Sequence, residues 1–330
     1  MRLLRLALVL VTAACALPAA AVSNPLEPGA PAPSSRVAIF YYPWFATPKS
    51  DGRYAHWQQG GIQPPDDVAS SFYPARGIYS SADTLVVDAQ LAEIAAAGIG
   101  TVITSWWGRD SREDRRLPLL LGAARRRGLT VAAHLEPYRG RTVASTEADI
   151  GYLRGLGISD VYIWASSDLP DAEWADMNSR VEGTRVFANT NLPGRAAAGG
   201  FDGLYTYDVL LFDGILFPRL CRQARRLHLL CAPSVGPGYD ARRATADLRV
   251  KPRRDGARYD GMWRGALRAE ADLVTITSYN EWHEGTQIEP ARSDRSGYES
   301  YEGAWGLLGT AAETAYLDRT AFWVTRLMRR

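Results

Sequence analysis

The chain of 330 residues is 46% hydrophobic and 22% charged, a balance that is typical of folded globular proteins and excludes a disordered chain. Its 38 basic and 36 acidic residues nearly cancel. We therefore expect no nucleic-acid partner and no stable membrane partner, because both depend on a strong positive field. The composition is unusual in its aromatic residues, ten Trp and sixteen Tyr, and in having only two lysines, Lys49 and Lys251.

The amino-terminal residues have the pattern of an export signal. Arg2 and Arg5 flank an apolar run that ends in small residues, which predicts a signal peptide over residues 1–21. The sequence thus predicts a secreted or periplasmic protein, with lipid anchoring through Cys15 or an uncleaved membrane anchor as alternatives. Residues 22–36 are rich in Pro and Ala and are expected to form a linker.

Strands and helices alternate along the remainder of the chain. Apolar and aromatic runs predict strands at Val37–Trp44, Gly100–Trp107, Thr130–Leu135, Asp160–Trp164, Arg185–Asn189, Gly203–Tyr207, His228–Ala232 and Leu273–Ser278. Helical spacing predicts helices at Asp83–Ala97, Leu117–Arg127, Thr146–Leu156, Ala172–Val181, Phe212–Arg226, Tyr259–Ala269 and Ala311–Met328.

The strands are apolar on both faces, which is typical of a parallel sheet covered by helices. Eight such strands in one chain favour a single (β/α)8 TIM-type barrel. An open doubly wound sheet is the alternative, but no Gly-rich phosphate turn follows the first strand.

Two cysteines, Cys221 and Cys231, remain after removal of the predicted signal peptide. Export would permit a disulfide between them, and the sequence leaves their pairing open. Neither cysteine lies in the electropositive setting of a thiol nucleophile.

The predicted strand ends carry the residue types of a sugar-binding cleft. In a barrel, chemistry is located at the carboxyl ends of the strands. These ends carry aromatic rings, carboxylates and amides, namely Tyr41, Tyr42, Trp44, Trp106, Trp107, His134, Glu136, Tyr138, Trp164, Asn189, Asn191, Tyr207, Asp208, Ser234, Tyr239, Asn280, Glu281, Trp282, His283 and Glu284. Rings stack on the CH faces of a pyranose, and carboxylates and amides bind its hydroxyls. The alternative is that aromatic residues are simply common in strands.

The segment after the last predicted strand holds Glu281, His283, Glu284 and Glu289. The pair His283–Glu284 begins an H-E-x-x-H zinc pattern, but the position of the second histidine is occupied by Gln287. We therefore expect no transition-metal site and no cofactor, although a hard cation held by carboxylates stays open.

Paired carboxyls in one cleft favour glycoside hydrolysis, which needs one protonated and one ionised acid. Crowding pushes the pKa values of two such groups apart. Retaining glycosidases normally hold these groups roughly 5 Å apart across the sugar ring, from different strands. Glu281 and Glu284 come from one loop, so a nucleophile–acid pair would be awkward. One catalytic glutamate with one loop-capping glutamate is the alternative.

The segment SYNEWHEGTQIEP, residues 278–290, closely resembles the signature of glycoside hydrolase family 99, the endo-α-1,2-mannosidases. Similar stretches occur in the family's order at Phe40–Trp57, Ser70–Asp83, His134–Arg141 and Pro233–Asp240, with a weaker one at Arg253–Trp263. The resemblance implies that residues 37–330 form one (β/α)8 catalytic domain that cuts internal α-mannosidic bonds with retention.

The resemblance also implies a mechanism that suits two acids on one loop. Glu281 would be the base that removes the proton of the sugar 2-hydroxyl, which attacks the anomeric carbon and forms a 1,2-anhydro sugar. Glu284 would be the general acid/base. We expect the pKa of Glu284 to be raised and Glu281 to be ionised at rest.

Further residues are implied to bind the α-mannoside substrate, an oligosaccharide or polysaccharide, in what we expect to be a monomer. They are Tyr42, His56, Trp106, Trp107, His134, Glu136, Tyr239, Asn280, Trp282 and His283. For Tyr42 and the tryptophan pair, plain core packing is the alternative.

The sequence departs from the family pattern in two loops. Phe45-Ala46 replaces a more usual Tyr-Gly, and residues 241–252 lack the usual Trp-Asn. These departures bear on the outer sugar subsites. The alternative functions are another endo-α-glycanase on the same barrel and a non-catalytic exported polysaccharide-binding protein.

Overall fold

The protein is described here by a computed structural model in which residues 31–329 are placed. Residues 31–330 group into one compact unit. The predicted signal peptide, Cys15 and residues 22–30 of the predicted linker lie outside the described residues. No helix in the described part of the chain has the length and apolarity needed to cross a membrane.

Eight parallel strands form a closed barrel, in the order β1-β10-β7-β6-β5-β4-β3-β2. They are β1 (Ser34–Tyr41), β2 (Ile99–Trp106), β3 (Thr130–Leu135), β4 (Asp160–Ile163), β5 (Arg185–Asn189), β6 (Gly203–Thr206), β7 (Leu230–Val235) and β10 (Val274–Ile276). A short antiparallel hairpin consists of β8 (Tyr239–Asp240) and β9 (Val250–Lys251). The (β/α)8 barrel predicted from the strand count is confirmed.

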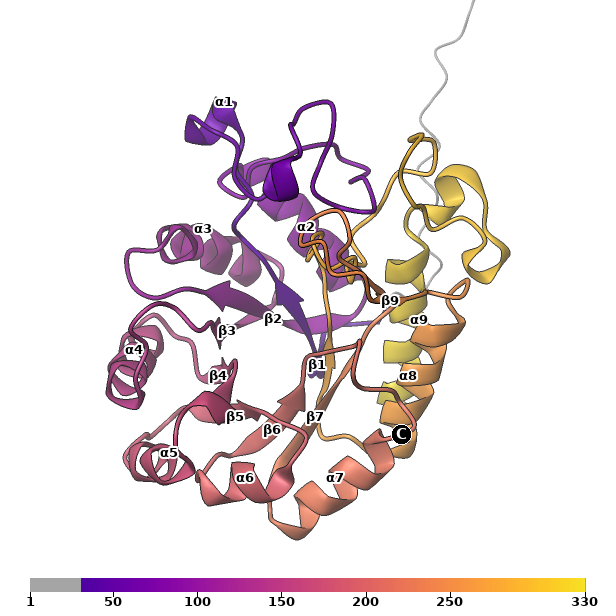
Figure 1. The fold of residues 1–330 in the computed structure, drawn as a ribbon. Coiled ribbons are helices and arrows are strands. Elements are labelled where there is room, and N and C mark those ends of the chain that lie inside the picture. Colours follow the sequence, from indigo (N-terminus) through magenta and orange to yellow (C-terminus); the bar gives the residue numbers. More distant parts are fainter. Residues whose placement is uncertain (1–30, 330) are drawn as a thin grey trace, which may run out of the picture. The chain divides into compact units, whose positions relative to one another are not determined.

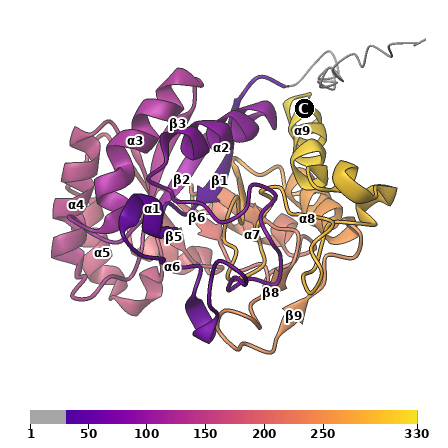
Figure 2. The ribbon, with the colours of Figure 1, turned by 90° about the horizontal axis from the view of Figure 1, so that it is seen from above.

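Helices surround the strands, as Figure 1 shows from one side and Figure 2 from above. They are α1 (Pro48–Asp51), α2 (Thr84–Ala96), α3 (Arg112–Arg126), α4 (Val143–Gly155), α5 (Asp171–Asn178), α6 (Pro193–Ala198), α7 (Phe217–Arg226), α8 (Ala257–Arg268) and α9 (Ala315–Met328). Short 3-10 turns occur at Gln59–Gly61, Ser166–Asp168, Ala304–Gly306 and Gly309–Ala312.

Several element boundaries differ from the sequence prediction for local reasons. Strand β1 begins inside the predicted linker, because the Ser34 amide donates to the Gly98 carbonyl at 2.8 Å. Helix α3 begins at Arg112, where the Ser111 side chain caps the Asp114 amide. Helix α7 begins at Phe217 because Pro218 fits a first turn and not a helix interior. Helix α6 and the β8–β9 hairpin were not predicted.

Side-chain alternation divides the barrel core into an outer and an inner layer. On β1, Val37, Ile39 and Tyr41 pack outward against the helices, whereas Ala38 and Phe40 point inward. The inner layer contains Ala38, Phe40, Tyr42, Ile103, Ala132, Tyr162, Phe187, Tyr205, Tyr207 and Ala232. The inner layer therefore contains four of the tyrosines, whereas most of the buried tryptophans and tyrosines pack in the outer layer.

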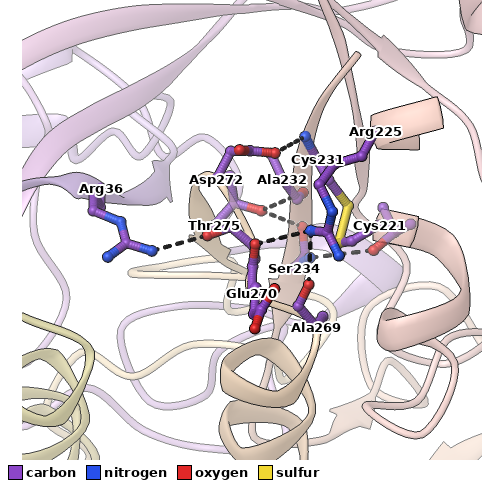
Figure 3. The surroundings of a disulfide bond; sticks show 12 residues. Arg36, Cys221, Arg225, Cys231, Ala232, Ser234, Ala269, Glu270, Asp272 and Thr275 are labelled. Carbon is purple, nitrogen blue, oxygen red and sulfur yellow. Dashed lines mark hydrogen bonds between the residues drawn. A yellow bond between two sulfur atoms is a disulfide. The ribbon is translucent and has the colours of Figure 1, made fainter. Parts of the chain in front are cut away.

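A disulfide joins Cys221 on α7 to Cys231 on β7, which settles a pairing that the sequence left open. Figure 3 shows that hydrogen bonds to the next βα unit surround it. Arg225 donates to the carbonyls of Ala269 and Glu270, and the Cys231 amide donates to Asp272 at 2.9 Å. The bond therefore fastens one helix of the outer layer to its strand.

Candidate active site

A pocket of about 180 Å³ opens at the carboxyl ends of the barrel strands. It is lined by Tyr42, Trp44, Trp107, His134, Glu136, Pro137, Trp164, Tyr207, Glu281 and Glu284. Three carboxylates and several aromatic rings thus share one small space. His134 is on β3, and the other residues lie in the segments that follow β1, β2, β3, β4, β6 and β10.

The two glutamates predicted to be catalytic project from one self-closed loop, residues 278–289, which we name the carboxylate loop. The Ser278 amide donates to the Thr286 carbonyl, and the Ile288 amide donates to the Ser278 carbonyl, each at 2.9 Å. The Ser278 hydroxyl also accepts the Glu281 amide at 2.8 Å. These bonds hold the beginning and the end of the loop together, so Glu281 and Glu284 are presented from a fixed turn.

Glu281 is 3% exposed and lies against the backbone of its own loop. Its Oε1 accepts the His283 amide at 3.1 Å and lies 3.4 Å from the His283 Nδ1. Burial raises the pKa of Glu281 well above its usual range, and the charge of Glu284 raises it further. This direction differs from the expectation that Glu281 is ionised at rest, because burial outweighs the backbone donors.

Glu284 keeps partial exposure to the pocket and is flanked by a phenol. The Tyr207 hydroxyl donates to Glu284 Oε2 at 3.4 Å and lies 2.5 Å from the Tyr42 hydroxyl. Burial raises the pKa of Glu284 to about 7, and the negative charge of Asp208 adds to the effect. Near neutral pH, therefore, Glu284 is protonated in a large fraction of molecules, as a general acid must be.

A third carboxylate, Glu136, follows β3 on the same inward face as His134. Its Oε1 accepts the Ser105 hydroxyl at 2.8 Å and lies 3.1 Å from the His134 Nδ1. The His134 Nε2 is bonded to the Tyr205 hydroxyl at 2.8 Å. The charge of Glu136 also raises the pKa values of Glu281 and Glu284. Three acids in one pocket cannot all be ionised without a cost.

Trp106, the last residue of β2, and Trp107, which follows it, face opposite ways, since the side chains of an extended chain alternate. Trp107 lines the pocket, is 37% exposed, and donates its Nε1 to the Ser105 hydroxyl at 3.1 Å. Trp106 is fully buried in the outer layer, where its Nε1 donates to Asp114 at 2.9 Å. The structure thus places Trp107 at the site and Trp106 in the packing behind it.

Asn280 and Trp282, both expected at the sugar site, belong to the carboxylate loop, but they lie outside the pocket lining. The Asn280 side chain accepts the Tyr42 amide at 2.7 Å and donates to the Tyr42 carbonyl at 3.0 Å. The Trp282 indole donates to the Glu289 carboxylate at 2.9 Å. Asn280 therefore ties the loop to β1, and Trp282 ties it to a buried carboxylate.

His56 and His283 lie beside the pocket and interact with each other. The His283 Nε2 donates to the His56 carbonyl, and the His56 ring stacks on Trp44 with centroids 4.4 Å apart. Burial lowers the pKa of His283 to about 4 and that of His56 to about 3. Both rings are neutral at pH 7, and the His283 Nδ1 turns a lone pair towards Glu281.

Tyr239, the remaining residue expected at the site, lies outside the pocket lining. It begins β8 and donates its hydroxyl to Asp247 at 3.0 Å. It borders a second cavity of about 280 Å³, together with Arg253 and Gly285, on the other side of the carboxylate loop.

Trp44, Trp164 and Tyr207 line the pocket but are absent from the set of substrate-binding residues chosen from the sequence. All three are among the residues that the sequence analysis assigned to the strand ends. Choosing the residues on the inward face of each strand would have identified Tyr207 as a site residue. Within residues 31–329, no cluster of three or more His, Cys, Asp and Glu side chains is arranged to hold a metal ion.

A (β/α)8 barrel with paired buried acids and aromatic walls at the carboxyl ends of its strands has the site of a glycoside hydrolase. Comparison with known families agrees: the model of "Glycosyl hydrolase family 99" matches residues 34–329. The chain belongs to this family and is a glycoside hydrolase.

Individual relatives support the assignment. A glycoprotein endo-α-1,2-mannosidase-like protein of Danio rerio is 32% identical over 77% of this chain and 71% of its own length. The glycoprotein endo-α-1,2-mannosidase of Xenopus laevis is 29% identical over 91% of this chain and 78% of its own. The structure of the GH99 endo-α-mannosidase from Bacteroides thetaiotaomicron is 28% identical, with a TM-score of 0.81 over 90% of this chain and 98% of that one.

Proposed function

We propose that the protein is a retaining endo-acting α-mannosidase that hydrolyses internal α-1,2-mannosidic bonds of glycans or mannan. The observation that carries the proposal is the placement of Glu281 and Glu284 on one loop at one pocket, with the pKa of each raised by burial. The relatives named as endo-α-1,2-mannosidases support the choice of substrate.

The first half of the reaction requires no protein nucleophile. Glu281 accepts the proton of the sugar 2-hydroxyl while O2 attacks C1, and the bond from C1 to the leaving oxygen breaks. Glu284 donates its proton to that oxygen, and a 1,2-anhydro sugar forms. A hydroxyl that donates to Glu281 stabilises the carboxylate and lowers its pKa, so the substrate itself favours the basic form.

The second half reverses the proton transfers. The Glu284 carboxylate removes a proton from water, the water oxygen attacks C1, and the bond from C1 to O2 breaks. O2 regains its proton from Glu281. Two inversions at C1 give net retention, and both acids return to their starting states.

The pocket walls provide groups suited to a neutral sugar. Trp44, Trp107 and Trp164 offer ring faces for stacking. Tyr42, Tyr207 and Glu136 add hydroxyl and carboxylate groups to the same lining, and such groups are suited to sugar hydroxyls.

Digestion of defined α-1,2-linked mannosides, with product length and anomeric form analysed, tests the function. Release of an oligosaccharide with retained configuration is expected, and cleavage of α-1,3-glucan instead would favour another endo-α-glycanase. Glu281→Gln and Glu284→Gln should each abolish hydrolysis while leaving glycan binding intact. A substrate whose reacting mannose lacks the 2-hydroxyl should resist cleavage. Near wild-type activity of Glu281→Gln would exclude the anhydro-sugar route without excluding the mannosidase function.

Export is a further part of the proposal and rests on the predicted signal peptide over residues 1–21. The Cys221–Cys231 disulfide supports it, because such bonds persist in oxidising compartments. Amino-terminal sequencing of the mature protein tests it. A start near residue 22 is expected, a lipid on Cys15 would indicate an anchored form, and an intact leader would contradict cleavage.

A further inference from the structure

We propose that Arg253 is a positioning residue for Glu284. It holds residues 284–287 of the carboxylate loop, which we name the returning limb, from the side opposite the pocket. The inference rests on the proposed role of Glu284 as the acid/base. Arg253 follows β9 and borders the second cavity, so it lies outside the pocket that receives the sugar.

Arg253 binds the loop directly after its second acid. The Arg253 Nη2 donates to the Gly285 carbonyl at 3.0 Å and to the Gln287 carbonyl at 2.7 Å. The Glu284 carbonyl itself accepts the Asp240 amide, on β8, at 2.7 Å. The β8–β9 hairpin and Arg253, two residues after it, thus satisfy three carbonyls of this limb.

The contact between the hairpin and the limb leaves no room for adjustment. Gly285 has φ of 63°, and a Cβ atom there would lie 2.9 Å from the Asp240 carbonyl oxygen. The two sides of the hairpin are equally close to each other, since a Cβ at Gly238, just before β8, would lie 2.6 Å from the Lys251 carbonyl oxygen on β9. Because the limb follows the hairpin so closely, the orientation of Glu284 depends on what holds these two segments together.

The guanidinium of Arg253 is enclosed by three aromatic rings. Its Cζ lies 4.5 Å from the centroid of the Phe72 ring and 4.6 Å from each of the Tyr301 and Tyr316 rings. Rings at this distance attract a cation and fix the plane of the guanidinium. They belong to the loop after β1, the segment before α9, and α9 itself, so Arg253 links the carboxylate loop to distant parts of the chain.

This arrangement depends on the flat guanidinium of an arginine. Both carbonyls accept from one nitrogen, Nη2, while the guanidinium lies among the three rings. A lysine ammonium is a compact and strongly hydrated point charge, which fits poorly among rings. Loss of Arg253 should let the limb shift, and misplacement of a general acid by even about 1 Å costs on the order of 100-fold in rate.

The test compares substrates that differ in their need for an acid. Arg253→Ala and Arg253→Lys are assayed on an α-1,2-mannotetraose, whose leaving sugar must be protonated, and on an aryl α-mannobioside with an acidic phenol, which needs little protonation. We expect kcat/KM on the tetraose to fall about 10- to 100-fold, with a much smaller loss of kcat/KM on the aryl glycoside, because kcat/KM reports the steps up to departure of the leaving group and excludes the second half that both substrates share. Guanidinium ion should restore part of the activity of Arg253→Ala.

Arg243→Ala is the matched control. Arg243 also lies over a ring, with its Cζ 4.3 Å from the Tyr298 centroid, and donates to the Gly297 carbonyl at 3.0 Å, away from the carboxylate loop. The Arg243→Ala variant should have a lower thermal stability, and any loss of its activity should be the same for both leaving groups.

Equal losses on both substrates, or a selectivity that Arg243→Ala shares, would overturn the positioning role and leave Arg253 a general structural residue. Unchanged kinetics of both Arg253 variants would overturn it as well. If Arg253→Ala does not fold, Arg253→Lys carries the same comparison. A wild-type protein that cleaves neither mannoside would overturn the proposed function instead, which separates the two failures.

Discussion

The indole Nε1 of Trp282 donates a hydrogen bond of 2.9 Å to the carboxylate of Glu289, a side chain with no exposed surface. Trp282 stands between the two proposed catalytic acids, so the turn that carries them is anchored to a buried charge. Glu289 also accepts from Arg76 at 2.7 Å and from Gln90 at 2.8 Å. The carboxylate is therefore an anchor for the loop and takes no part in the chemistry.

Glu289→Gln should destabilise the protein, because a neutral amide removes one of the two carboxylates that pair with Arg76 and turns one of the two buried acceptor oxygens into a donor. Each buried donor that loses its acceptor costs about 1–3 kcal/mol. Urea unfolding measures this loss, and kcat should fall with it as the loop loosens. Glu147→Gln is the control, since its pair with Arg180 is exposed and screened by solvent, so that its loss should change the stability little. Similar losses in the two variants would contradict the anchoring role.

Trp106 and Trp107 offer a matched pair of neighbours with opposite surroundings. Trp107→Ala should raise KM for the glycan with little change in stability, because the ring lies on the pocket wall. Trp106→Ala should cost about 3–5 kcal/mol of unfolding free energy, as removal of a buried aromatic ring does. Steady-state kinetics and urea unfolding of both variants check the division. An unchanged KM for Trp107→Ala would argue against a stacking role.

Trp106 and Trp107 also show how much of the fold and the site could be predicted from the sequence. Apolar runs located every barrel strand, and strand ends located both acids, because these features depend on neighbours in the chain. Alternation along β2 would also have separated Trp106 from Trp107, since Ile103 and Ser105 share the inward face with Trp107. The sequence contains this alternation, but it can be assigned only when one side chain of the strand is known to face the barrel interior.

Other features could not be read from the sequence, because they depend on contacts between distant segments. Trp282 and Asn280 have the composition of sugar-binding residues, and only the fold reveals that they turn towards Glu289 and β1. The pKa of Glu281 is another case. Its rise comes from burial beneath the loop, whereas the sequence argument weighed only the mutual repulsion of two acids.

The pH dependence of kcat/KM should report Glu284. Its pKa of about 7 means that the acid form is lost as pH rises through this value, so activity should fall above about pH 7. Tyr207→Phe removes a donor to the carboxylate, which raises the pKa and should move this basic limb to higher pH.

Tyr162→Phe is the control for this profile. Its ring stacks on Phe187 in the barrel interior, with centroids 4.6 Å apart. This variant should leave the basic limb in place. If the basic limb of the pH profile moved to lower pH in Tyr207→Phe, the assignment of this limb to Glu284 would be contradicted.

The disulfide should contribute measurably to stability. It closes a short loop between residues 10 apart in sequence, for which a chain-entropy argument gives about 2–3 kcal/mol. The double variant Cys221→Ala, Cys231→Ala should lose this amount in urea unfolding and keep its kcat, because both cysteines lie in the outer layer. Added reductant should destabilise the wild type and leave the double variant unaffected.

The two lysines have unequal surroundings. Lys251 is half-buried and donates to the carbonyl of Phe212 at 2.9 Å, whereas Lys49 is exposed on α1. Amine-reactive dyes and supports act on lysine and ignore the many arginines. Among the described residues, coupling chemistry of this kind would therefore attach the enzyme through Lys49, on the loop that also carries Trp44 and His56. An enzyme immobilised in this way would be held by the same loop that lines the pocket through Trp44.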